Sequence, residues 1–188
     1  MKIALINAII FCCVICFSAQ AQSNRIKFNS INSGGIAIGE SGSDAVFQTI
    51  NGVSNPGWFF GAGIGIDYYQ YKTLPLFFDV RKFFGKNGKG FVYGDAGYNF
   101  TLKNKPGKDF NYFDTYSFKG GIYTDFGIGI KTKLIKSSSL LFSLGHSYKE
   151  LRGRYGVTIC PFAGPCYVDY SDLKFSYGKI ILKAGVEF

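Results

Sequence analysis

Apolar and polar residues alternate with a period of two along most of the chain. The pattern is clearest over Phe118–Leu134, where Ile, Thr, Phe and Leu occupy alternate positions and Tyr, Asp, Gly and Lys lie between them. The final segment, Lys179–Phe188, repeats it. A period of two is typical of a β-strand whose two faces differ chemically. Six further segments have the same pattern, which predicts eight strands in total: Phe28–Gly39, Val46–Gly52, Trp58–Tyr71, Leu74–Phe84, Phe91–Leu102 and Leu140–Leu151.

The links between successive predicted strands form two sets, the even-numbered and the odd-numbered links, which differ in length. The second, fourth and sixth links are short, and two of them contain the Asn, Pro and Gly residues that favour tight turns. The remaining links include two long ones. This alternation predicts an all-β fold, an eight-stranded antiparallel up-and-down transmembrane β-barrel with a lumen filled by side chains. The short links are Val53–Gly57, Gly85–Gly90 and Ile135–Ser139; the others are Glu40–Ala45, Lys72-Thr73, Lys103–Asp114 and Arg152–Asp172.

Charges of both signs lie on the less apolar face of the predicted strands. In a membrane barrel they would pair inside the lumen, whereas contact with hydrocarbon would cost several kcal/mol for each. Glycines on this face would make room for long Arg, Lys and Tyr side chains. The alternative is a soluble, lipocalin-like barrel that binds an apolar ligand inside and turns its charges to water. The charges are Asp67, Asp79, Arg81, Asp95, Asp125, Lys131, Lys133, Lys183 and Glu187, and the glycines are Gly61, Gly63, Gly65, Gly97, Gly127 and Gly129.

Aromatic residues concentrate near the predicted strand ends. Their amphipathic rings suit the headgroup level of a bilayer, where they would form two girdles. An ordinary aromatic core is the alternative. The residues are Trp58, Phe59, Phe60, Tyr68, Tyr69, Phe83, Phe84, Phe91, Phe100 and Tyr148.

The N-terminus has the three parts of a secretory signal. Lys2 gives a positive start, Ile3–Phe17 is uncharged, and Ala19-Gln20-Ala21 places small residues before a cleavage site. Cleavage of residues 1–21 would leave residues 22–188 as one barrel domain. The 188-residue chain carries a formal net charge of +9, but export removes it from nucleic acid, so we expect no nucleic-acid partner.

Two of the five cysteines, Cys160 and Cys166, lie outside the predicted signal. In an exported chain this favours one disulfide, with two free thiols as the alternative. His146 is the only histidine, so two sulfurs would lack the further ligands that a tetrahedral zinc shell requires. We expect neither a metal nor another cofactor.

Three consecutive segments carry a resemblance to a known family. Gly61–Tyr68 is glycine-rich, Leu74–Arg81 reads LPLFFDVR, and Tyr93–Tyr98 reads YGDAGY. In this order they resemble the small outer-membrane β-barrel family common in Bacteroidota. The resemblance implies an integral barrel of the outer membrane, usually without an assigned activity. The terminal Phe188, which closes an alternating strand, looks like the signal read by the barrel assembly machinery.

The chemistry of the chain does not favour catalysis. His146 and Ser147 are adjacent in one predicted strand, so they point to opposite faces and could not act together on lipid A. A barrel enzyme that modifies lipid A is therefore only a remote alternative. We therefore expect a monomeric, non-enzymatic barrel with a structural or surface-interaction role, and the outer loop Arg152–Asp172 would contact an unknown partner. Basic residues of the outer loops could face lipopolysaccharide phosphates or act only as solubilising charge: Lys103, Lys105, Lys108, Lys149, Arg152 and Arg154.

Overall fold

A computed structural model describes residues 26–40, 42–68, 72–102, 115–135, 138–162 and 164–188. Nearly all of them lie in β-strands. No helix in this part of the chain is long and apolar enough to cross a membrane. The elements are β1 (Lys27–Gly39), β2 (Gly42–Asn55), β3 (Trp58–Asp67), β4 (Thr73–Phe84), the 3₁₀ turn η1 (Lys86–Gly88), β5 (Gly90–Thr101), β6 (Thr115–Lys119), β7 (Gly121–Ile135), β8 (Ser138–Ile159) and β9 (Tyr167–Glu187).

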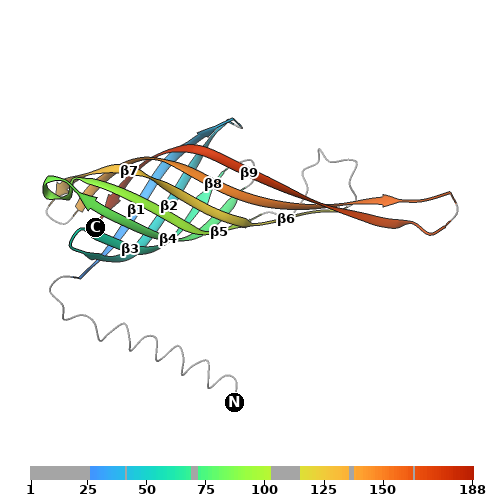
Figure 1. Cartoon of the computed structure of the whole chain (residues 1–188), viewed down its shortest axis with the longest axis horizontal. Coiled ribbons are helices and arrows are strands. Elements are labelled where there is room, and N and C mark those ends of the chain that lie inside the picture. Colours follow the sequence, from blue (N-terminus) through green and yellow to red (C-terminus); the bar gives the residue numbers. More distant parts are fainter. Residues whose placement is uncertain (1–25, 41, 69–71, 103–114, 136–137, 163) are drawn as a thin grey trace, which may run out of the picture.

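The strands close into a ring (Figure 1). Each strand pairs antiparallel with the next span along the chain, and β9 pairs with both β8 and β1. β6 and β7 both pair with β8 on either side of Gly120, so they form one span. The ring therefore has eight spans, which confirms the predicted fold class.

Burial alternates along the wall in the phase that the sequence predicts. On β3, Phe59 and Asp67 are buried, whereas Phe60 and Ile64 are exposed. The same alternation on the other spans directs the charged side chains of the wall, together with some aromatic and aliphatic ones, into the barrel, and turns the other face, which is mainly apolar, outward. This orientation is opposite to that of the lipocalin-like alternative.

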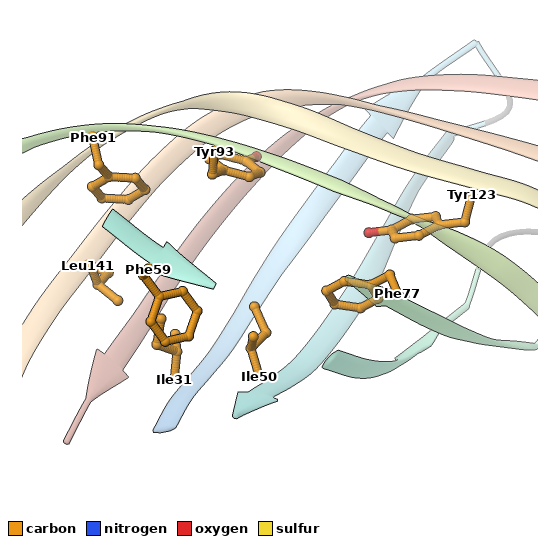
Figure 2. Close-up of a cluster of buried hydrophobic side chains, with 8 residues drawn as sticks. All are labelled: Ile31, Ile50, Phe59, Phe77, Phe91, Tyr93, Tyr123 and Leu141. Carbon is orange, nitrogen blue, oxygen red and sulfur yellow. The ribbon is translucent and has the colours of Figure 1, made fainter. Parts of the chain in front are cut away.

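Aromatic and aliphatic side chains fill part of the lumen (Figure 2). They come from seven strands and point into the space that the ring encloses, as a cluster of Ile31, Ile50, Phe59, Phe77, Phe91, Tyr93, Tyr123 and Leu141. Glycines make this packing possible: a Cβ added at Gly129 would lie 2.3 Å from Cζ of Phe91, and one at Gly63 would lie 2.5 Å from the Phe77 ring. Gly61, Gly63 and Gly129 thus make room for aromatic rings, whereas Gly97 and Gly127 allow close approach of the neighbouring backbone.

The predicted loop Arg152–Asp172 is wrong in extent. β8 has 22 residues and β9 has 21, and they pair without a register shift from Ser139 opposite Glu187 to Ile159 opposite Tyr167. They extend past the other strands as a long hairpin (Figure 1). The link is reduced to the few residues around the disulfide between Cys160 and Cys166. The hairpin can extend this far because the two strands satisfy each other's backbone hydrogen bonds, even where no other part of the chain covers either face.

Other boundaries differ by a few residues. β1 and β2 meet across Gly39 and Gly42, so most of the predicted link Glu40–Ala45 is strand. β2 also continues to Asn55, and Gly57 then closes the turn with a φ of 81°, which favours glycine. The predicted link Lys103–Asp114 lies outside the described residues.

Candidate functional site

Three carboxylates lie side by side inside the barrel. Asp79 on β4 is directly opposite Asp95 on β5, and Asp95 is directly opposite Asp125 on β7. All three are buried. Like charges on adjacent strands repel one another, so this arrangement requires cations in the same space.

Arg81 provides the first cation. Its Nε donates to both carboxylate oxygens of Asp79, at 3.1 and 3.0 Å, and its Nη2 donates to Oδ2 at 2.9 Å. The guanidinium also lies 5.4 to 6.0 Å from the ring centroids of Phe59, Phe91 and Tyr93. Arg81 therefore joins the carboxylates to the aromatic cluster.

Lys183 on β9 provides the second cation. Its Nζ lies 2.8 Å from Asp125 Oδ2 and 3.7 Å from Asp95 Oδ2, and it donates to Gln48 Oε1 at 3.2 Å. The Tyr93 hydroxyl donates to Asp125 Oδ1 at 2.9 Å. Side chains from β2, β4, β5, β7 and β9 therefore meet in one network inside the lumen, which links five strands of the wall.

A second group of charges lies at the end of the barrel from which the long hairpin projects. Lys149 forms an ion pair with Asp67, and Thr73 also donates to Asp67. Lys179 pairs with Asp44. The prediction that Lys149 lies in an outer loop is therefore wrong, because β8 is still part of the ring at this residue and its odd-numbered positions point inward.

The opposite end opens into a cavity of about 970 Å³ lined by polar and charged residues. Lys131 Nζ lies 2.7 Å from Glu187 Oε1, and Asn29 also donates to Glu187. Lys133 lines the same cavity but is exposed, because it lies at the rim. The structure thus separates Lys133 from the buried charges with which the sequence grouped it.

His146 and Ser147 point to opposite faces of β8. His146 is exposed on the outside, where its ring lies 5.6 Å from that of Phe126, and Ser147 is buried. The arrangement provides no nucleophile and base in mutual reach. Within the described residues, no cluster of three or more His, Cys, Asp or Glu side chains could hold a metal ion.

The predicted aromatic girdles are correct only in part. Phe59 and Phe91 are buried in the lumen, and Phe83 packs against the same cluster. The error arises because these rings are close to strand ends but on inward-facing positions. Trp58, Phe60, Phe84, Tyr68 and Phe100 are exposed on the outer surface, whereas Tyr148 is half-buried there and Tyr69 lies outside the described residues.

Sequence reasoning missed several polar members of the lumen. Gln48, Tyr93 and Tyr123 are buried, and Gln48 Nε2 donates to the Tyr123 hydroxyl at 2.8 Å. Asp44 was missed as well, whereas Tyr123 and Lys179 lie on the less apolar face that the sequence predicts but were not among the predicted lumen charges. Their positions alternate with outward apolar residues, so strict counting along each strand could have found them.

Phe188 is joined to the first strand by its backbone. Its N–H donates to the Ser30 carbonyl at 3.0 Å, and the Ser30 N–H donates to the Phe188 carbonyl at 2.8 Å. The side chain is exposed. The last residue thus takes part in closing the ring while its ring remains on the outer surface.

Comparisons with known proteins agree with this architecture. No family model matches the chain, and no curated protein matches it. Among solved structures, the outer membrane protein AlkL in lipid bilayers is similar, with a TM-score of 0.51 and 12% identity over 90% of this chain and 92% of that one. OprG from Pseudomonas aeruginosa aligns with a TM-score of 0.47 and 11% identity over 87% of this chain and 92% of that one. The likeness to AlkL and the closed ring of eight spans show that the chain has the fold of small outer-membrane β-barrel proteins.

Proposed function

We propose that the chain is an integral barrel of the outer membrane of a Gram-negative bacterium. It is exported with residues 1–21 as a cleaved signal, and the assembly machinery recognises its C-terminal strand. The barrel acts as a rigid, plugged scaffold that presents the β8–β9 hairpin at the cell surface. It performs no catalysis.

The direction of the outer side chains is the observation that supports this proposal most. Apolar residues such as Phe78, Phe126, Ile128 and Ile180 are more than half exposed, and others like them cover the outer surface. A continuous apolar surface of this extent is unfavourable in water and favourable in hydrocarbon. The buried ion pairs of the lumen complete the pattern, because they remove charge from the lipid side.

The hairpin supports a role in surface contact. Beyond the ring it exposes Ile159, Phe162, Tyr167 and Tyr170 close to the disulfide. Exposed aromatic residues on a rigid support are typical of interfaces, because they bury much area and lose little side-chain entropy. A protein partner with an apolar patch would fit this tip.

The base of the hairpin carries a basic surface. Arg152 is opposite Lys119 on one side and Lys174 on the other, and together they line a cleft of about 300 Å³ with Arg154 and Asp172. Arg154 donates to both carboxylate oxygens of Asp172 and holds the pKa of Asp172 below its usual range. The remaining positive charge fits the phosphates of lipopolysaccharide.

Gel mobility and protease access test the proposal together. The outer-membrane fraction is extracted with detergent and run with and without boiling, and intact cells are treated with trypsin. We expect a heat-dependent shift and cleavage at the hairpin arginines in intact cells. Release of the protein without detergent, with no heat-dependent shift, would contradict the proposal and favour a soluble barrel.

The absence of catalysis has its own test. A His146→Ala variant should leave the mass spectrum of lipid A unchanged relative to cells that express the wild-type chain. A chain-dependent change in lipid A that this variant abolishes would overturn the proposal of a non-enzymatic barrel.

A further inference from the structure

Four polar side chains form a contiguous patch on the outer surface of the barrel. Ser30 and Asn32 are on β1, and Thr49 and Asn51 are on β2. Ser30 lies directly opposite Asn51, and Asn32 lies directly opposite Thr49. We call these four residues the polar patch.

The polar patch points away from the lumen. Ile31 and Ile50 alternate with its members and are buried inside the barrel, so the patch residues occupy outward positions. Asn32 and Asn51 are exposed. The interior of the barrel therefore cannot supply hydrogen-bond partners for their amides.

Apolar residues surround the polar patch on every side. Phe28 and Val53 lie toward the turn between β2 and β3, and Ile36 and Phe47 lie toward the hairpin end, all of them exposed. Val186 on β9 is opposite Asn32, and Ala62 on β3 is opposite Asn51. The patch is thus inside the apolar belt and not at its rim.

Other outward polar residues of the described wall have different surroundings. Thr124 is opposite Ala96 and Tyr148, and the Tyr148 hydroxyl donates to Glu150 and Ser176. His146 is opposite Phe126 and Ile180. The polar patch differs because it brings together two exposed amides, Asn32 and Asn51, at diagonal positions of two paired strands.

Hydrocarbon cannot satisfy such a patch. An amide that loses water without gaining a hydrogen bond is costly, and in membranes this cost favours contact between polar surfaces of protein segments. Asn carries both a donor and an acceptor, and Ser and Thr hydroxyls do as well. An identical patch related by a two-fold axis can therefore pair with it, as closed symmetric dimers require.

The surface next to the patch allows close approach. A recess of about 540 Å³ is lined by Asn32, Gly34, Phe47, Thr49 and Ile64, among others. The Phe47 ring packs over Gly34, 3.3 Å from the position that a Cβ would take there, so the recess lies beside an aromatic ring that a second copy can contact.

We propose that the polar patch is a symmetric interface through which two copies of this chain pair side by side in the membrane. Asn32 and Asn51 of one copy exchange hydrogen bonds with the same residues of the other. This inference rests on the proposed membrane location, and it replaces the expectation of a monomer drawn from the sequence.

The test compares two double variants in phosphatidylcholine vesicles. Energy transfer between donor-labelled and acceptor-labelled barrels is followed as lipid dilutes the protein. We expect the wild-type barrel to associate and Asn32→Val/Asn51→Val to lose at least tenfold in association constant. The matched control Thr124→Val/His146→Leu, which also removes two outward polar groups, should associate like the wild type.

Cysteine cross-linking keeps the inference testable if the double variant fails to fold. Under oxidation, Asn51→Cys should give a covalent dimer and His146→Cys should not. Wild-type barrels that stay monomeric at every dilution, or patch variants that associate like the control, would overturn the proposal. The gel shift on the same samples separates the proposed dimer from the proposed membrane barrel. A monomer whose mobility shifts on heating contradicts only the dimer, whereas absence of the shift contradicts the membrane barrel.

Discussion

Substitution of Arg81 should destabilise the barrel more than any surface change. Arg81 and Asp79 are both buried, at 5% and 1% exposure, and three hydrogen bonds join them. In Arg81→Met the Asp79 carboxylate stays inside without its main partner. Removal of one member of a buried ion pair costs about 3–5 kcal/mol, and lost contact with three aromatic rings adds to it. We therefore expect a loss of about 4 kcal/mol in the free energy of unfolding.

The paired variant distinguishes a buried-charge penalty from a simple loss of packing. In Asp79→Leu/Arg81→Met both charges are replaced by apolar groups, and such replacements are often neutral or stabilising. The double variant should therefore regain most of the stability that the single variant loses. Arg154→Met is the matched control, since it removes a similar two-bond contact with Asp172 on the exposed hairpin and should leave the urea midpoint unchanged.

Urea unfolding of the barrel in lipid vesicles measures these differences. The folded fraction is read from the gel shift of unboiled samples and from the fluorescence of the single tryptophan, Trp58. A loss below about 1 kcal/mol for Arg81→Met, or a double variant as unstable as the single one, would refute the reasoning that the pair is buried in a low-dielectric lumen.

Three further predictions concern packing, the disulfide and assembly. Gly129→Ala should lower the folded fraction in the gel-shift assay, because its Cβ would meet an aromatic ring at 2.3 Å, whereas Gly94→Ala, which has nothing within 4 Å, should not. Replacement of Cys160 and Cys166 by Ser should leave the gel shift intact but speed trypsin cleavage of the hairpin, since the short ring restrains only its tip. Phe188→Ala should slow insertion in pulse-labelled cells without changing the urea midpoint, because only its backbone pairs with β1; an equal effect on both would contradict a role as assembly signal.

The sequence by itself determined the number of spans and divided the residues of each span between two faces. Alternation is a local property, so Phe118–Leu134 and Lys179–Phe188 revealed their faces without any partner. The charges on the less apolar face were predicted to lie in the lumen of a membrane barrel, and Asp79, Arg81 and Asp125 are buried there. The cysteine spacing also predicted the disulfide that the structure contains.

The ends of the spans were not determined in this way. The outer half of the β8–β9 hairpin is exposed to solvent on both faces. Its sequence therefore lacks the alternation of apolar and polar residues that is typical of a strand in the barrel wall, and this segment was predicted as a loop. Lys149 lies near the end of the predicted strand Leu140–Leu151 and was grouped with the outer loops, although the ring extends past it. Local patterns do not show where neighbouring strands stop, because that depends on their relative stagger.

Only the tertiary structure decided which inward and outward residues meet. Lys183 reaches Asp125 because only β8 separates β9 from β7 in the ring, although the two residues are 58 positions apart in the sequence. The polar patch likewise exists only because the register places Ser30 opposite Asn51 and Asn32 opposite Thr49. Strand register and ring closure are long-range properties, because they are set by backbone pairing over the whole barrel. They therefore create both the lumen network and the polar patch from residues that lie far apart along the chain.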